Sequence, residues 1–311
     1  MPEKKNTMTL TAFRHAGGLL LLSLLLQSCA TNQLRSFPAV QSYQHRDLQL
    51  PASGETTAPA IRVMTLNIAH GRGDSFHQLL QGSDTTLANL TTIASLFKTT
   101  APDVVALQEA DAPSRWSGRF DHVAFLAEHS RYGCTVHGVH ASNRLYSFGT
   151  ALLAPRRMEN PRVHDFEPSW PTTNKGFTQA ELAWNPEGQL ETPLRVRFAS
   201  VHLDFSRRSV RRAQIDEMVA VVGAGEGPLV LMGDFNTDWQ TPGSSLKDLA
   251  DRLGLMVYEP HAEGLATYGD KGARLDWILV SPEFRFERYA VYPDIVSDHY
   301  AVAAVIALAG E

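Results

Sequence analysis

The chain has 311 residues, of which 43% are hydrophobic, 17 are proline and two are cysteine. This composition excludes an intrinsically disordered chain, a collagen-like repeat and a disulfide scaffold, and it predicts a globular protein. The 28 basic residues against 33 acidic residues give a formal net charge of −5. Any binding to a polyanion must therefore come from a local basic cluster.

The N-terminal residues have the pattern of a secretory signal. Three basic residues precede the apolar run 17–26, which is shorter than the ~20 residues that a membrane-spanning helix needs. The run leads into Leu-Gln-Ser-Cys, ending at Cys29, and resembles a bacterial lipoprotein signal rather than an ordinary one followed by an incidental cysteine. The resemblance implies removal of residues 1–28 and lipidation of Cys29. Residue Cys29 is followed by Ala30 and not by an aspartate. The resemblance therefore favours the outer membrane of the cell envelope over the inner membrane.

Three regions are therefore expected: the signal 1–28, a lipidated cysteine with a flexible tether at 29–60, and one domain at 61–308. The tether is rich in Gln, Ser, Thr, Ala and Pro and has little apolar periodicity. Cys134 is then the remaining thiol, which excludes an intramolecular disulfide, and we expect it to be a buried core residue.

The domain alternates apolar β-rich runs with amphipathic helical patterns, which predicts an α/β fold. One segment, 159–193, contains five prolines and is expected to be an irregular surface excursion near the site. The expected strands are 61–68, 103–108, 148–153, 194–203, 228–232, 275–280 and 300–308, and the expected helices are 84–98, 210–222 and 244–253.

Polar residues recur where these strands end. A single one is usually a turn former, but six strands each carry an Asn, Asp, Glu or His there. Carboxylate and amide oxygens suit Mg²⁺ or Mn²⁺, and histidines suit proton transfer at neutral pH. The set indicates metal-assisted hydrolysis of a phosphate ester. Its members are Asn67, Glu109, His202, Asp234 with Asn236, Asp276, and Asp298 with His299.

These residues lie in six motifs whose order resembles that of the endonuclease/exonuclease/phosphatase superfamily, the DNase-I-like fold. The resemblance implies one four-layer α/β sandwich, with two mixed β-sheets packed face to face and helices outside. The motifs are Thr65-Leu66-Asn67-Ile68, Val105-Ala106-Leu107-Gln108-Glu109, Ser200-Val201-His202-Leu203-Asp204, Met232-Gly233-Asp234-Phe235-Asn236-Thr237-Asp238, Arg274-Leu275-Asp276-Trp277-Ile278 and Ser297-Asp298-His299-Tyr300-Ala301-Val302.

The resemblance also implies roles for the binding of metal and phosphate. Asn67 and Glu109 would hold Mg²⁺ or Mn²⁺, with Asp298 as a further ligand. Asp234 would orient or deprotonate the attacking water, and Asn236 would hydrogen-bond the scissile phosphate.

The two histidines of the set complete the implied site. Asp276 would fix the tautomer of His299 at the phosphate, and His202 would be the second imidazole facing it. Which imidazole donates a proton is left open.

Departures from the superfamily pattern narrow the range of expected substrates. Apurinic endonucleases carry Tyr and then Pro-Asn where this chain has His202-Leu203-Asp204. Secreted DNases carry an Arg where this chain has Asp111, and an acid in a DNA groove would repel phosphates. The first departure disfavours the apurinic-endonuclease subfamily, and the second weakens the case for duplex DNA as the substrate.

Four further features keep two interpretations each. We expect His70 to be a surface residue rather than part of the metal site. We expect Asp238 to cap a turn and Asp204 to cap the helix that follows it. The basic cluster Arg207–Arg212 fits either a contact with a polyanion or phospholipid headgroup, or a solvated helix face.

The preferred function is a metal-dependent phosphodiesterase acting by attack of water on phosphorus, in a monomer tied to the membrane by its lipid. Its substrate is a phosphate ester, and a phospholipid is attractive because a lipidated enzyme sits at a membrane. A nuclease acting on DNA or RNA is the first alternative. A lipoprotein that binds without turnover is the second.

Overall fold

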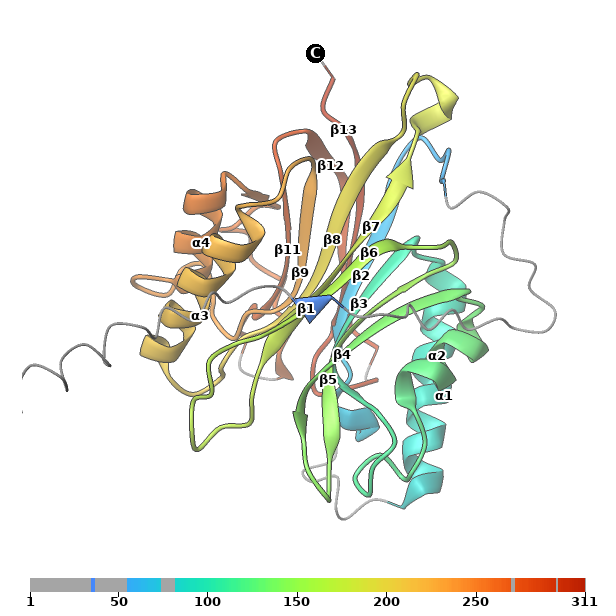
Figure 1. Cartoon of the computed structure of the whole chain (residues 1–311), viewed down its shortest axis with the longest axis vertical. Coiled ribbons are helices and arrows are strands. Elements are labelled where there is room, and N and C mark those ends of the chain that lie inside the picture. Colours follow the sequence, from blue (N-terminus) through green and yellow to red (C-terminus); the bar gives the residue numbers. More distant parts are fainter. Residues whose placement is uncertain (1–34, 37–54, 74–81, 270–271, 295, 311) are drawn as a thin grey trace, which may run out of the picture. The chain divides into compact units, whose positions relative to one another are not determined.

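The computed structural model describes residues 35–36, 55–73, 82–269, 272–294 and 296–310 (Figure 1). All of them belong to one compact unit, Leu34–Glu311. The predicted signal segment, Cys29 and most of the predicted tether lie outside these residues. Among the helices that are described, none is long and apolar enough to cross a bilayer.

The described strands form two mixed β-sheets. Their bounds are β1 Arg35–Ser36, β2 Ile61–Asn67, β3 Val104–Asp111, β4 Cys134–Ser142, β5 Ser147–Ala154, β6 Glu159–Asp165, β7 Gly176–Trp184, β8 Leu194–His202, β9 Leu229–Asp234, β10 Met256–Val257, β11 Asp276–Val280, β12 Phe284–Tyr292 and β13 Ala301–Leu308. One sheet has the order β1-β6-β7-β8-β9-β11-β10 and the other β12-β13-β2-β3-β5-β4. Each sheet combines a parallel pair with antiparallel pairs.

Four α-helices cover the outer faces of the sheets (Figure 1). They are α1 Ser83–Thr100, α2 His122–Ser130, α3 Arg208–Val222 and α4 Ser245–Leu253. Helix α1 turns Leu90, Ile93 and Phe97 inward at helical spacing, and the three are buried with α2 in one cluster against β2, β3 and β5. Helices α3 and α4 are buried in a second cluster against β8, β9 and β11.

The third apolar cluster lies between the two sheets. Val63 and Val302 of one sheet pack there with Phe198 and Ile278 of the other, and all four are fully buried. Alternation along each strand sends every second side chain into this layer. The arrangement of helix, sheet, sheet and helix confirms the four-layer α/β sandwich. Cys134, fully buried in the same cluster, is a core residue as expected.

The expectation of an irregular excursion at 159–193 was wrong for most of this segment, which contains β6 and β7. Residues 166–175 between the two strands are irregular and end at Lys175, which contacts His202. Prolines break the apolar alternation that would mark a strand, and a register shift between Glu159 and Arg162 breaks it further. Strand β12 was not predicted either. Its arginines and glutamate lie on an edge strand, where charged side chains face solvent.

Contacts also begin earlier in the chain than Ile61. Thr56 forms a β-bridge with Trp184, whose indole N–H donates to the carbonyl oxygen of Ala58 at 2.7 Å. These residues of the predicted tether therefore contact β7.

Candidate functional site

Strand register brings the polar strand ends together at one end of the sandwich. His202 of β8 is the register partner of Asp234 of β9, which in turn is the partner of Asp276 of β11. In the other sheet, Asn67 ends β2 beside Gln108 of β3. The amide of Asn67 donates to Asp234 Oδ2 at 3.1 Å, which joins the two sheets at this point.

A hollow of about 430 Å³ opens at this end. Asp276 lies behind it, in contact with His299. The other seven predicted site residues all line the hollow, namely Asn67, Glu109, His202, Asp234, Asn236, Asp298 and His299.

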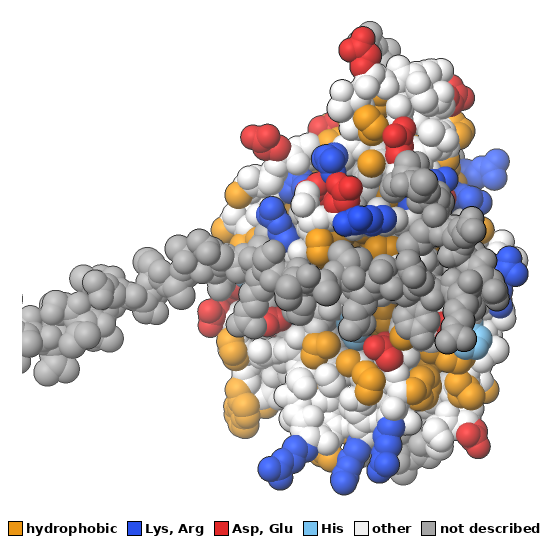
Figure 2. Space-filling view, turned by 45° about the vertical axis from the view of Figure 1, so that its right-hand side comes forward, with side chains coloured by type: hydrophobic (Ala, Val, Ile, Leu, Met, Phe, Trp, Pro, Cys, Tyr) orange, Lys and Arg blue, Asp and Glu red, His pale blue; other side chains and the backbone are white. Residues whose placement is uncertain are grey.

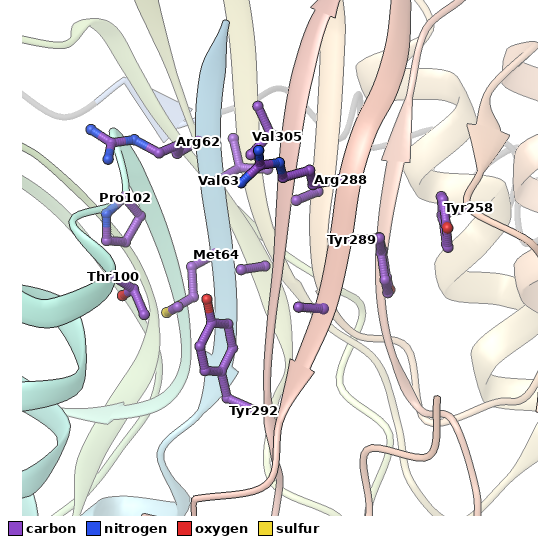
Figure 3. Close-up of a pocket in the computed structure, with 13 residues that line it drawn as sticks. Arg62, Val63, Met64, Thr100, Pro102, Tyr258, Arg288, Tyr289, Tyr292 and Val305 are labelled. Atoms are coloured by element: carbon purple, nitrogen blue, oxygen red, sulfur yellow. The ribbon is translucent and has the colours of Figure 1, made fainter. Parts of the chain in front are cut away.

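A larger hollow, of about 560 Å³, lies on the outer face of β2, β13 and β12 (Figure 3). Arg62, Met64, Arg288 and Tyr292 are among its lining residues, and none of those that the structure describes is a carboxylate or an imidazole. It lacks the acid–base groups that hydrolysis needs, so volume alone does not identify the site.

Glu109 reaches the hollow because β3 bulges at this residue. The register with β5 shifts between Leu107 and Ala110, and Glu109 has a left-handed φ of 50°. Such a backbone conformation is unfavourable for a non-glycine residue and persists only where the surrounding structure holds it. Burial opposes the charge of Glu109, but the positive charges of His70 and Lys175 outweigh it and lower the pKa of this carboxyl.

His70 is part of this arrangement, so the expectation that it is a surface residue was wrong. Its side chain is buried, with Nδ1 2.9 Å from Asp111 Oδ1 and Nε2 3.2 Å from Glu109 Oε2. Burial opposes its charge, yet Glu109 and Asp111 raise its pKa. The Phe148 ring packs edge-on against the imidazole, with the two ring centroids 4.6 Å apart. This apolar contact could not be predicted from the position of His70 in the sequence.

Asp111 was expected to face a groove and repel phosphates, and this was also wrong. The residue is fully buried and paired with His70. Its carboxylate holds the imidazole that contacts Glu109, so it gives no argument against a polyanionic substrate.

Asp234 lines the hollow and is almost fully buried. It accepts hydrogen bonds from the Asn67 amide and from the backbone N–H of Asn236, the latter at 2.9 Å. Its Oδ2 lies 3.6 Å from His202 Nε2 and 3.8 Å from His299 Nε2. Burial raises the pKa of Asp234 to about 7, against the opposing effect of His299. A carboxylate with this pKa is matched to proton transfer near neutral pH.

His299 and Asp276 form a hydrogen-bonded pair. His299 Nδ1 lies 2.8 Å from Asp276 Oδ2, which also accepts from the Thr267 hydroxyl at 2.7 Å. Burial disfavours a charged imidazole here, but Asp276 and Asp234 outweigh it and raise the pKa of His299 to about 10. The imidazole is therefore cationic, with Nε2 turned toward Asp234.

His202 is neutral, unlike the cationic His299. Part of the cause is Lys175, which was not predicted from the sequence. Lys175 Nζ lies 3.3 Å from both ring nitrogens of His202 and is buried at the start of β7. Burial and this ammonium group lower the pKa of His202 well below its usual value. Burial lowers the pKa of Lys175 itself, while Glu109 and Asp234 oppose the shift.

Asn236 and Asp298 line the hollow with their polar groups already engaged. Asn236 has a φ of 50°, and its amide donates to the Leu203 carbonyl at 3.0 Å. Asp298 Oδ2 lies 2.5 Å from Arg72 Nη2, which places a cation beside the carboxylate expected to be a further metal ligand.

Asp238 caps a turn, as expected, by accepting from the backbone N–H groups of Gln240 and Arg274. The expectation that Asp204 caps the following helix was wrong, because the N-cap of α3 is Arg207, whose side chain makes no capping hydrogen bond. Asp204 instead accepts from the backbone N–H of Arg207 at 2.7 Å, in the turn that leads into α3. Within the basic cluster, the Arg208 and Arg211 side chains donate to backbone carbonyls of the protein. These arginines are therefore partly structural.

The donor atoms fit a hard divalent cation. Glu109 and the Asn67 carbonyl supply oxygen ligands at the edge of the hollow. Asp276 Oδ1 is buried, and no donor among the described residues reaches it. Asp234, Asp276 and His299 also offer ligand atoms within 4.8 Å of one another. Both sets already have partners within the protein. Asp276 Oδ2 contacts His299 Nδ1, Asn67 Oδ1 accepts from the backbone N–H of Ala69 at 3.0 Å, and Glu109 Oε2 lies 3.2 Å from His70 Nε2.

The chain matches the family model of the endonuclease/exonuclease/phosphatase family over residues 64–299. It belongs to this family, whose members hydrolyse phosphate esters. A search of curated proteins gives no match.

Solved structures with the same fold include three that illustrate the range of the family. A family protein from Leptotrichia buccalis is 18% identical, with 79% of this chain and 99% of that chain covered and a TM-score of 0.60. A mannosyl-6-phosphatase from Bacteroides thetaiotaomicron is 18% identical (80% and 100%, TM-score 0.59). The human Nocturnin catalytic domain with a bound sulfate anion is 19% identical (81% and 96%, TM-score 0.59). At these identities the likeness shows the fold alone.

Proposed function

We propose that the protein is a divalent-metal-dependent phosphodiesterase that catalyses attack of water on phosphorus. The observation that carries the proposal is the position of Asp234, a carboxylate with its pKa near 7, between a neutral and a cationic imidazole in one hollow. Oxygen ligands at Glu109 and Asn67 border the same space.

Each residue has a distinct chemical task in this proposal. Asp234 accepts the proton of the attacking water. His299, held cationic by Asp276, donates from Nε2 toward the phosphate or its leaving oxygen. Lys175 and neutral His202 stabilise the negative charge that grows on the phosphate oxygens. Mg²⁺ or Mn²⁺ at Glu109 and Asn67 would neutralise phosphate oxygens when bound.

A diester is favoured over a monoester because apolar and aromatic groups stand beside the polar ones. Phe205, Tyr268 and Leu275 line the hollow, and such walls can receive the organic substituents on both sides of a phosphodiester. The mannosyl-6-phosphatase with the same fold makes a phosphomonoester the second candidate.

The test is release of a chromogenic phenol from a bis-aryl phosphate with Mg²⁺ or Mn²⁺. Asp234→Asn removes the proton acceptor, so we expect the rate to fall by about 10²-fold or more. Asp251→Asn, an exposed carboxylate on α4, is the matched control and should keep full activity. Chelation should abolish turnover in both the wild type and the control.

Two results would contradict the proposal. One is turnover that persists in the chelator, and the other is equal activity of Asp234→Asn and Asp251→Asn. Hydrolysis of an aryl monoester but not of the diester would favour the phosphatase candidate.

A further inference from the structure

Two aromatic side chains are exposed beside the hollow that contains Asp234. Trp170, in the segment between β6 and β7, is 87% exposed, and Phe205, which follows β8, is 63% exposed. Phe205 also lines the hollow. Large apolar side chains gathered on one surface mark a contact site.

The Trp170 segment is held in place by a polar network. The guanidinium group of Arg207 donates to the carbonyl oxygens of both Ser169 and Trp170, the latter at 3.0 Å. The Thr172 hydroxyl donates to Asp204 Oδ2 at 2.7 Å, and Asp204 is fully buried. A buried carboxylate and an arginine thus fix a segment whose tryptophan points into solvent, which is the pre-organisation expected of a binding surface.

A third exposed apolar residue belongs to a turn at the same end of the sandwich (Figure 1). Leu145, in the turn between β4 and β5, is 46% exposed. The Trp170 segment and the hairpin of β4 and β5 approach each other here. Lys175 Nζ, at the end of the Trp170 segment, lies 6.0 Å from the centroid of the Phe148 ring in β5. Both turns lie at the lower end of the sandwich in Figure 1. We call Leu145, Trp170 and Phe205 the apolar rim.

Basic side chains accompany the apolar rim. Arg144 neighbours Leu145 in its turn, Arg208 begins α3, and both are exposed. Helix α3 has no acidic residue in its first turn, although anions are the favoured charges there. Figure 2 shows Lys and Arg side chains projecting from the lower end of the molecule. Tryptophan and arginine together suit the headgroup layer of a bilayer.

We propose that the apolar rim docks on the surface of a phospholipid bilayer, so that the hollow faces lipid phosphates. The inference rests on the proposed function for its chemistry, while the docking is a separate property. A bilayer fits better than single-stranded nucleic acid because Leu145 is aliphatic and cannot stack on bases. The lipid predicted on Cys29 would bring the apolar rim to the same surface.

The test uses the chain from Ala30 onward, which lacks the lipidated cysteine and keeps every residue of the three apolar clusters. Its sedimentation is measured with vesicles of phosphatidylcholine and phosphatidylglycerol. We expect binding that Trp170→Ser weakens about tenfold and that Leu145→Ser weakens less. Met256→Ser is the matched control. Met256 is also exposed, at 40%, but pairs with Val280, at the opposite end of β11 from Asp276.

A second readout reports which residue enters the lipid. Brominated lipids should quench part of the tryptophan fluorescence of the wild type, and Trp170→Phe should lose that part. Neither Trp170 nor Leu145 lines the hollow, so their variants should hydrolyse the soluble aryl diester at the wild-type rate.

Docking is overturned if the wild type does not bind vesicles, or if Trp170→Ser and Met256→Ser bind equally. With turnover of the soluble diester intact, either result leaves the proposed function standing. It is also overturned if Trp170→Ser weakens binding of a single-stranded oligonucleotide while no variant binds vesicles, because the surface would then serve nucleic acid. Vesicle binding without turnover would support docking and contradict the phosphodiesterase.

Discussion

Lys175 is a buried cation that contacts His202 from behind the residues that line the hollow. It lies 3.3 Å from both imidazole nitrogens and is 6% exposed. A buried ammonium group beside a phosphate site stabilises charge that develops in the transition state. We expect Lys175→Met to lower kcat on the aryl diester by about 10²-fold, with a smaller change in KM.

Lys175→Arg restores the charge and should recover part of this rate, which a purely structural lysine would not show. Lys98→Met, an exposed lysine on α1, is the control. Equal kcat in the two methionine variants would place Lys175 outside the reaction.

Single residues also show where sequence reasoning stops. Asp234 and His299 lie in motifs whose order is itself informative, so their residue types and spacing identify them. Lys175 and His70 carry no such signal. Lys175 precedes β7 in a proline-rich segment, and His70 follows β2 with a φ of 56°. Their places in the site depend on the packing of two sheets, which local spacing does not encode.

At the scale of elements, β8 and β9 meet too closely for a side chain at Gly233. This residue has a φ of 154°, and a Cβ there would lie 2.0 Å from the carbonyl oxygen of Val201. Gly233→Ala should therefore push β9 away from β8 and lower the free energy of unfolding by about 2–3 kcal/mol. Urea unfolding measures this loss.

Because Asp234 follows Gly233 directly, the same variant should lose activity on the aryl diester in its folded fraction. Gly82→Ala is the matched glycine control, since no atom lies within 4 Å of its added Cβ, and it should unfold close to the wild-type midpoint. A Gly233→Ala protein with the wild-type midpoint would contradict this account of the close contact.

Most elements followed from apolar periodicity, including α1 and the central strands. The exceptions have physical causes. Strand β4 carries His137 and His140 among its apolar residues, and β12 lies at a sheet edge with its charges in solvent. The face-to-face packing of the sheets came from the resemblance to a known superfamily. Periodicity identifies the apolar face of each strand but does not say which other face covers it.

At the scale of the whole molecule, several histidines are buried in a neutral state, and this makes stability depend on pH. Burial lowers the pKa of His122, His137 and His140. The unfolded chain binds protons at these positions below about pH 6.5, whereas the folded chain binds them only at lower pH. Their contribution to stability is therefore complete above pH 6.5 and is lost as the pH falls toward their lower folded pKa values.

His140 offers the cleanest test because its two ring nitrogens lie 2.8 Å from Asp165 Oδ1 and from Thr150 Oγ1, away from the hollow. Between pH 7.5 and pH 5.5 the wild type should lose more unfolding free energy than His140→Gln, by urea unfolding at both values, because burial lowers the pKa of His140 in the folded state. The difference reaches at most about 1.4 kcal/mol, the limit for an imidazole that stays neutral in the folded chain. His299 and Asp234 contribute the same pH dependence to both proteins and cancel in the comparison. An equal loss in the two proteins would mean that His140 becomes protonated in the folded state, with Asp165 accepting a hydrogen bond from the charged ring.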